Sequence, residues 1–496
     1  MNDVFDGCLK AVNSALDLRI RGVNGVKTKG YAATGLMSAL VVGLVVGCGS
    51  EVPTSPAASS KVIKINTSSK SNSFSGQMIK VAFQQYGGGE QTFDWLSSVA
   101  KQFEKLYPGA KVQLIPINAS ENEYYTKLDL MNQSASTAPD VMEEDTFLIN
   151  SDASAGYLMP LNEFVKHWTD WNQDYFPAMQ RAGESVNGTI YGIPFNTDTR
   201  GIWYNKILFK KLGLPVPWQP KTWSDILKVA ELIKARDPQV IPLWFYSGKP
   251  AGEASTMQGF EMLLYGTKDT LYDAHTGKWV VESPGFLDSL AFVQKIFKDG
   301  LAEPLQDALT PNSGELLTQQ YMPNQQVGMA IDGEWDFSTW MPTGPKPWAD
   351  WYNVYGLAKM PKEFGGGYTS MSGGWTLAIS SKTRHAQEAW AFIKLACDRD
   401  NTLMIDLLDG NVTPRKDVAS MPQYKNFGHG VLALAASFNE FTHFRPAYAQ
   451  YPTISNDIQT AMENVMTGQM SPQQAMDQYA QQVTEFVGKS HVEIAK

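Results

Sequence analysis

Strand and helix patterns alternate along the chain from residue 78 onward, and this alternation constrains the fold more than any other feature. Residues 78–83 (MIKVAF) form a short β-prone run, and residues 111–117 (KVQLIPI) form the next one. Between the two runs, apolar side chains repeat at helical spacing, namely Phe93, Leu96, Val99, Phe103 and Leu106. Strand, helix and strand at this spacing are typical of a parallel sheet with crossover helices. The sequence therefore predicts an α/β fold.

Several helix boundaries can also be recognised. Thr222-Trp223-Ser224-Asp225 resembles a capping box, and Ser471-Pro472 supplies an N-cap followed by proline in the first turn. The three glycines at 87–89 follow the first strand but lack the GxGxxG spacing of a dinucleotide site. We expect this glycine loop to let a ligand approach the backbone, and we expect no cofactor.

Composition and charge narrow the class of protein. The 496 residues suffice for two domains, and 43% hydrophobic with 18% charged residues is typical of a globular protein. The net charge is -9 and no long Lys/Arg run occurs, which argues against nucleic acid as a partner. The six histidines are scattered, and Cys8, Cys48 and Cys397 form no metal-ligand spacing. No metal site is expected.

An apolar segment near the start indicates export. Residues 32–47 carry no charge, are too short to span a membrane, and follow Lys27 and Lys29. The segment ends Val45-Val46-Gly47-Cys48, which resembles the bacterial lipobox, a signal in which the chain is cut before a lipidated cysteine. We therefore predict a lipoprotein signal peptide at 1–47, lipidation of Cys48 and a flexible tether at 48–75. An uncleaved signal anchor is the alternative.

A specific family resemblance begins at Tyr191, where the chain reads YGIPFNTDTRGIWYNKILFKKLGLP. This segment resembles the central signature of the family 1 extracellular solute-binding proteins of ABC importers, the group that includes maltose-binding proteins. Further matches follow the order of that family, at residues 139–147, 155–164, 328–337, 372–380 and 445–455. Together the matches extend over residues 78–488.

The resemblance implies a periplasmic-binding-protein-like fold, in which two α/β lobes enclose a ligand in a cleft. It places lobe 1 at 76–198 plus 375–435 and lobe 2 at 203–370 plus 440–496. It implies a monomer, anchored outside the cell membrane, that captures a di- or oligosaccharide and delivers it to ABC importer permeases when the cleft closes. The protein is expected to bind its sugar and not to act as an enzyme. Trehalose, maltose, maltodextrins and other disaccharides all remain open.

Candidate sugar contacts follow from the chemistry of a sugar, which offers hydroxyls and patches of C–H. By resemblance, Trp335 and Trp375 stack on sugar rings, and Gly373 and Gly374 let the backbone come close; the alternative is that both tryptophans are core. Asp145 is the predicted sugar-binding carboxylate, or else a helix N-cap, and Glu144 is a weaker candidate. The remaining candidates are Glu90 after the first strand, Asn196 and Asp198 at the first crossover, where a turn role is the alternative, and Arg445 at the last crossover.

Two other functions compete with transport. An exported glycoside hydrolase also needs carboxylates and stacked tryptophans, but Glu143, Glu144 and Asp145 are adjacent on one strand. Adjacent strand residues point to opposite faces, so these residues do not flank a bond at the roughly 5–9.5 Å separation that hydrolysis requires. A module that presents its ligand to a chemoreceptor or sensor kinase is the second alternative.

Overall fold

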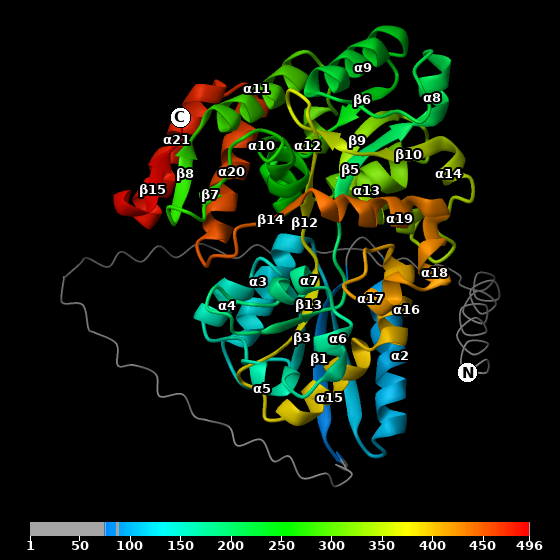
Figure 1. Ribbon diagram of the computed structural model, residues 1–496, viewed down its shortest axis with the longest axis vertical. Helices are drawn as coiled ribbons and strands as arrows, with labels where there is room; N and C mark the ends of the chain where they lie inside the picture. Colours follow the sequence, from blue (N-terminus) through cyan, green and yellow to red (C-terminus); the bar gives the residue numbers. More distant parts are fainter. Residues whose placement is uncertain (1–73, 75, 86–88, 496) are drawn as a thin grey trace, which may run out of the picture. The chain divides into compact units, whose positions relative to one another are not determined.

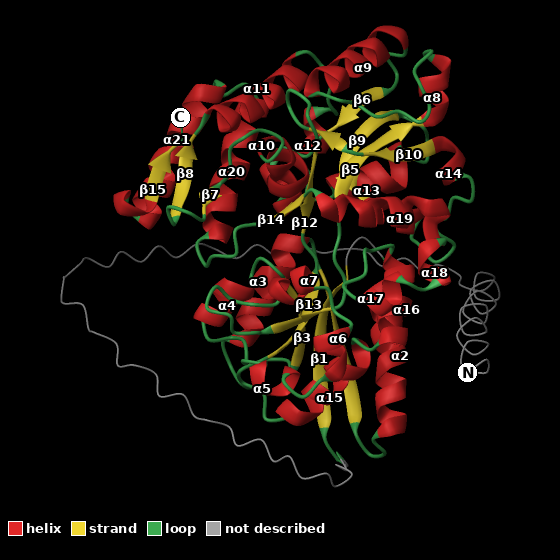
Figure 2. Ribbon diagram, viewed as in Figure 1, coloured by secondary structure: helices red, strands yellow, loops and turns green. Residues whose placement is uncertain are grey.

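Two separate β-sheets organise the described part of the chain, and helices cover both (Figure 1, Figure 2). The computed structural model describes residue 74 and residues 76–85 and 89–495. The predicted signal peptide, Cys48 and most of the predicted tether lie outside these residues. Among the described residues, no helix is both long enough and apolar enough to cross a membrane.

The first sheet, in the lower half of Figure 1, has five strands in the order β2-β1-β3-β13-β4. Their bounds are β1 (Met78–Gln85), β2 (Lys111–Asn118), β3 (Val141–Asp145), β4 (Gly192–Pro194) and β13 (Trp375–Ile379). β1 pairs in parallel with β2 and with β3, as the sequence predicts. β13 instead runs antiparallel to β3 and to β4, so the sheet is mixed. The predicted parallel arrangement therefore holds for β1, β2 and β3 but not for β13, because β13 enters the sheet from the second lobe and not through a crossover helix.

Helices pack on both faces of this sheet because successive strand residues point in opposite directions. Ile79, Val81 and Phe83 lie in one hydrophobic cluster with α2 and α15, whereas Ala82 lies in another cluster with α3. The helices around this sheet are α2 (Gln91–Leu106), α3 (Glu121–Asn132), α4 (Ile149–Ser154), α5 (Asn162–Val165), α6 (Thr169–Gln173), α7 (Pro177–Ala182), α15 (Ala386–Ala396) and α16 (Arg399–Asp409). The sheet and these helices form the first lobe.

The second lobe is built on a four-stranded sheet in the order β10-β5-β9-β6. The strands are β5 (Arg200–Asn205), β6 (Ile241–Trp244), β9 (Val327–Gly333) and β10 (Tyr355–Ala358). Two three-stranded sheets accompany it, made of β11 (Met360–Pro361), β12 (Tyr368–Ser372) and β14 (Thr442–Phe444), and of β7 (Tyr272–Asp273), β8 (Lys278–Glu282) and β15 (Val492–Ile494). In the main sheet Ile202 and Tyr204 enter one cluster and Trp203 enters the other, so both faces are covered.

Helices of the second lobe follow the boundary signals in the sequence. The capping box at Thr222 and Asp225 begins α9, and a second one at Ser471 and Gln474 begins α21. The helices of this lobe are α8 (Lys206–Lys211), α9 (Trp223–Arg236), α10 (Met262–Leu264), α11 (Pro284–Lys298), α12 (Leu305–Ala308), α13 (Ser313–Glu315), α14 (Trp351–Val354), α20 (Tyr451–Met466) and α21 (Pro472–Val487).

Three short helices lie between α16 and β14, namely α17 (Lys416–Ala419), α18 (Pro422–Lys425) and α19 (Val431–Ala436). The predicted limit of lobe 1 at residue 435 falls inside α19. Leu432 and Ala435 of α19 are buried in the hydrophobic cluster that holds Trp203 of β5 and Tyr355 of β10. The core of the second lobe therefore includes side chains from this linking segment, and the exact lobe limits remain a prediction.

Candidate functional site

A cavity of about 320 Å³ is lined by residues of both lobes. Its first-lobe wall lies at the carboxyl ends of β1 and β3 and includes Gln84 and Asp145. Its second-lobe wall includes Tyr246 after β6 and Asp332 on β9. Ligands of α/β proteins bind outside the carboxyl ends of strands, so this cavity is the candidate site.

Tryptophan exposure separates the site from the core. All fourteen tryptophans are buried except Trp335, Trp348 and Trp375, which are half-buried. Trp335 and Trp375 line the cavity, one from each lobe. The ring of Trp335 lies so close to Gly333 that a Cβ on this glycine would sit 2.0 Å from the ring. Trp375 packs against Tyr124 and Tyr125 of α3, so protein contacts fix the position of each ring.

Asp145 and Arg445 form an ion pair on the cavity wall. The Arg445 guanidinium donates to Asp145 at 2.5 Å, lies 3.3 Å from Glu253 and stacks on the Phe147 ring at 4.3 Å. Asp145 also accepts from the Tyr125 hydroxyl at 2.8 Å. Asp145 ends β3 of the first lobe, whereas Arg445 follows β14 beside the second lobe. The pair therefore connects the two lobes, and its charges hold each other in place.

A buried polar network extends from Arg445 into the second lobe. Glu253 accepts from Ser455 and, at 3.3 Å, from the Tyr451 hydroxyl. Tyr451 lies 3.1 Å from Glu261, which is fully buried. Burial raises the pKa of Glu253, an effect that the nearby Arg445 opposes, and burial raises the pKa of Glu261 to about 8. Arg445 is thus fixed from behind by groups on α20 and on the π-helical segment η2 (Ser255–Glu261).

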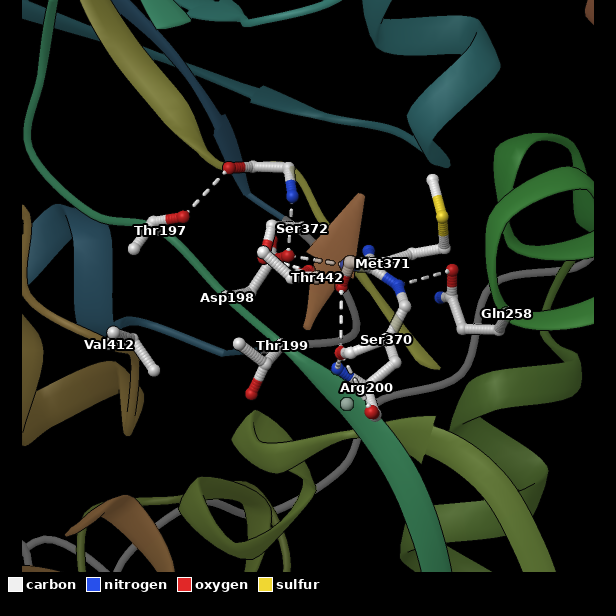
Figure 3. Close-up of polar contacts among 12 residues, drawn as sticks. Thr197, Asp198, Thr199, Arg200, Gln258, Ser370, Met371, Ser372, Val412 and Thr442 are labelled. Atoms are coloured by element: carbon white, nitrogen blue, oxygen red, sulfur yellow. Dashed lines mark hydrogen bonds and ion pairs between the residues drawn. The ribbon is translucent and has the colours of Figure 1, made fainter. Parts of the chain in front are cut away.

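The first crossover carries a second ion pair, formed by Asp198 and Arg200 (Figure 3). Asp198 also accepts the Gly373 backbone N–H at 2.7 Å, and Arg200 donates to Gln258 at 3.0 Å. The Arg200 guanidinium lies 4.8 Å from the centre of the Trp335 ring. Figure 3 shows Asp198, Arg200 and Gln258 close together where the chain passes between the lobes, so the crossover that joins the lobes also forms part of the cavity wall.

Gly374 and Asn196 bring two crossovers close together. The Trp375 backbone N–H donates to the Asn196 side chain at 2.8 Å. Gly374 has a φ of 122°, and a Cβ there would sit 2.6 Å from the Asn196 carbonyl oxygen. Only glycine adopts this conformation readily, so the close approach depends on it. The crossover at Gly374 is thereby fixed beside the crossover at Asn196, and Trp375 is positioned at the cavity.

The adjacent carboxylates Glu143 and Glu144 lie on opposite faces of β3. Glu143 lines the cavity and accepts the Gln84 backbone N–H at 2.7 Å. Glu144, a predicted site residue, does not line the cavity; it is fully buried on the other face, where Asp152 and Asp129 are its acidic neighbours. The prediction is corrected here because strand residues alternate in direction, and the sequence does not reveal which face meets the ligand.

Two further predicted residues lie beside the cavity and do not line it. Glu90 is exposed and sits immediately before α2, between Gly89 and Gln91, which do line the cavity. Gly373 stands behind the wall, where a Cβ would lie 2.9 Å from the Arg445 guanidinium and 3.5 Å from Asp198. The other predicted residues lie along the wall, namely Asp145, Asn196, Asp198, Trp335, Gly374, Trp375 and Arg445.

Several residues that line the cavity were not predicted from the sequence, among them Glu121, Arg200, Gln258, Asp332 and Asp336. Arg200 and the two aspartates lie within three residues of predicted positions, so proximity in the matched segments was an available signal. Glu121 and Gln258 lie on a helix start and a π-helical turn, where no pattern marks them. A second π-helical segment, η3 (Leu316–Tyr321), also borders the cavity, and such turns are frequent at functional sites.

Carboxyl groups around the cavity hold protons more tightly than usual. Burial raises the pKa of Glu121 to about 7 and that of Glu143 to about 8. It raises the pKa of Asp332 and of Asp409 to about 6 each. The neighbouring carboxylate of Asp145 adds to the effect at Glu121. Among the described residues, no group of acidic, histidine or cysteine side chains has the arrangement of a metal site.

The sequence matches the family of bacterial extracellular solute-binding proteins over residues 87–401. The chain belongs to this family. An uncharacterized ABC transporter extracellular-binding protein of Pyrococcus horikoshii is 25% identical over 400 residues, which cover 78% of this chain and 80% of the relative. The multiple sugar-binding protein of Streptococcus mutans is 23% identical over 339 residues, 66% of this chain and 73% of the relative.

A solved structure shows the same fold as the described lobes. The ABC transporter solute-binding protein of Thermotoga lettingae, bound with α-D-tagatose, has a TM-score of 0.71 and 26% identity, and the match covers 83% of this chain and all of that one. The predicted family and the predicted periplasmic-binding-protein-like fold are confirmed. Membership of an extracellular family also agrees with the predicted location outside the cytoplasm.

Proposed function

We propose that this protein captures a sugar in the cavity between its lobes and delivers it to an ABC importer. The cavity itself carries this proposal, because Trp335 and Trp375 offer partly exposed rings next to a wall of hydrogen-bonding side chains. Aromatic faces bind the C–H patches of a sugar, while carboxylates and amides bind its hydroxyls. The named relatives are sugar-binding or ABC transporter binding proteins, which supports the same function.

The size of the cavity favours a small sugar. Ligand pockets range from about 300 to 1,000 Å³, and this one, at about 320 Å³, lies at the lower end. A mono- or disaccharide therefore fits better than a long chain. Asn196, Asp198, Asp145 and Arg445 are proposed to hold its hydroxyls, since all line the wall at or near the crossovers.

Cleft closure is the proposed signal to the importer. The ion pair of Asp145 with Arg445 joins elements of the two lobes at the last crossover, so it helps to set how the lobes meet. A ligand that contacts both walls adds its binding energy to the closed arrangement. We propose that the permease subunits recognise this closed form, and that the protein works as a monomer anchored by a lipid at Cys48.

A thermal-shift screen of the purified mature protein against mono-, di- and trisaccharides tests the proposal. A sugar at one hundred times its dissociation constant stabilises the folded state by about 2.7 kcal/mol. At the same sugar concentration the stabilisation of a Trp375→Ala variant should be no more than about 1.4 kcal/mol, because its dissociation constant is expected to rise at least tenfold. If no sugar raises the melting temperature of the natural protein, sugar capture is refuted.

Hydrolysis and ligand presentation are the alternatives to transport. We propose that bound oligosaccharide is released intact, so chromatography after long incubation should recover it without shorter products. Any turnover that Glu143→Gln abolishes would instead favour a hydrolase, because Glu143 is a lining carboxyl group whose raised pKa suits a general acid. Uptake of radiolabelled sugar by cells that lack the gene separates import from presentation to a sensor. If the protein serves an importer, uptake is lost; if it only presents its ligand to a sensor, uptake is unchanged.

A further inference from the structure

Acidic side chains greatly outnumber basic ones on the cavity wall. Nine carboxyl groups line the cavity, compared with two guanidinium groups, and the described lining residues include neither lysine nor histidine. A neutral sugar needs hydrogen-bond acceptors, but amides and hydroxyls supply these without the cost of bringing like charges together. The excess of acidic groups therefore requires an explanation beyond hydroxyl recognition.

Both basic groups of the wall already have acidic partners. Arg445 lies between Asp145 and Glu253, at 2.5 and 3.3 Å. Arg200 pairs with Asp198 and donates to Gln258 at 3.0 Å. No basic lining side chain within the described part of the chain is therefore left to receive a carboxylate or phosphate of a ligand. The wall as a whole repels anions.

Four of the six remaining acidic groups form two pairs that repel one another. Asp332 and Asp336, on either side of Trp335, act on each other in the second lobe, and Glu143 and Asp409 do so in the first. Asp336 is 1% exposed, and its Oδ2 atom has no hydrogen-bond partner among the described residues. An unpartnered buried carboxylate oxygen on a cavity wall is costly unless a ligand donates to it. Asp332, in contrast, accepts from the Tyr246 hydroxyl at 2.6 Å.

We propose that the cavity selects a cationic sugar, one that carries a protonated amino group, over neutral sugars of the same shape, and that it rejects anionic sugars. The ammonium group donates toward Asp336 and Asp332. The sugar ring lies against Trp335, which stands between these two residues in the sequence. Glu143 and Asp409 add two carboxyl groups to the first-lobe wall, and a nearby cation favours the ionised form of each. This inference rests on the proposed function, because it concerns the sugar that this cavity takes.

Sugars that share one ring configuration and differ in charge and in one substituent test the proposal. Isothermal titration would compare glucosamine, glucose, N-acetylglucosamine and glucuronate, with the corresponding galactose and mannose sets and the β-1,4-linked dimers of glucosamine and N-acetylglucosamine. At least one amino sugar should bind tenfold or more tightly than its neutral counterparts. That preference should shrink between 20 and 200 mM salt, because screening weakens a charge interaction. No uronate should bind.

Isosteric variants connect the preference to the named carboxylates. Asp336→Asn should reduce the preference for the amine over its neutral partner to threefold or less. Asparagine keeps the shape of a side chain whose Oδ2 has no partner among the described residues and whose charged form burial disfavours, so this variant should fold at least as well as the natural protein. Glu143→Gln is a second variant on the opposite wall, and Glu485→Gln, on the exposed face of α21, is the control that should change nothing.

The outcomes separate this inference from the proposed function. If neutral sugars bind and no amine is preferred, or if Asp336→Asn keeps the full preference, the cationic ligand is refuted and sugar capture stands. If a uronate binds most tightly, the inference is likewise refuted. If neither neutral nor charged sugars bind, both proposals fail.

Discussion

Replacing Arg445 with methionine should destabilise the ligand-free protein more than almost any other change at the cleft. Arg445 is 7% exposed, and its guanidinium lies 2.5 Å from Asp145 and 3.3 Å from Glu253 and stacks on Phe147. Methionine keeps much of the apolar stem but leaves two buried carboxylates without their cation. Removing one partner of a buried pair costs about 3–5 kcal/mol, a large share of the about 5–15 kcal/mol that stabilises a folded domain.

Urea unfolding of the ligand-free protein at pH 7, followed by tryptophan fluorescence, measures this loss. Arg399→Met is the matched control, because Arg399 forms an exposed pair with Asp400 at 2.9 Å and its loss should cost less than about 1 kcal/mol. Adding Asp145→Asn to Arg445→Met should restore part of the lost stability, since the amide no longer carries an unpaired charge. The reasoning is refuted if Arg445→Met costs no more than Arg399→Met, or if the effects of Arg445→Met and Asp145→Asn simply add.

Three further predictions follow from the described contacts and from the export signal. Trp335→Ala and Trp375→Ala should each weaken sugar binding, measured by titration, at least tenfold, or about 1.4 kcal/mol. Trp348→Ala, which changes the third half-buried tryptophan, should not weaken it. Equal losses for all three variants would contradict the assignment of the cavity as the sugar site. Burial raises the pKa of Glu303 to about 8, so the folded protein keeps a proton that the unfolded chain loses above about pH 4.5, and stability should fall as pH rises toward 8. Glu303→Gln should reduce that decline by up to about 1.4 kcal/mol per pH unit in urea unfolding, and an unchanged pH profile would show that Glu303 is not the group responsible. Cys48→Ser should move the protein from the membrane to the soluble fraction of cells, while Cys397→Ser, which changes a buried thiol, should leave it membrane-bound; retention of the Cys48 variant would argue against lipidation.

Local sequence signals predicted much of the scaffold correctly. The apolar spacing that begins at Phe93 became α2, and the capping boxes at Thr222 and Ser471 begin α9 and α21. These features depend on neighbouring residues alone, because a cap or an amphipathic face is set within a few positions. The direction of a strand in its sheet, in contrast, depends on residues that are distant in the chain. β13 lies antiparallel between β3 and β4, and its partners are more than 180 residues away in the chain.

The candidate site shows the same division. Aromatic and acidic residues at the crossovers, such as Trp375 and Asp198, were predicted from their segments and do line the cavity. Glu144 was predicted as a weaker candidate beside Asp145, but the sheet turns Glu144 away from the cavity. Asp145 and Arg445 are 300 positions apart in the sequence, and their pairing depends on the way the two lobes meet.

The sequence alone determined the family, the alternation of strands and helices, and the residue types that a sugar site needs. These properties are carried by short segments whose chemistry does not depend on distant contacts. Only the tertiary structure decided which carboxylates face the cavity, which of them are already paired with Arg200 and Arg445, and which oxygen remains without a partner. The physical reason is that charge pairing and burial depend on distances across the fold, and the chain sets those distances only when both lobes have packed.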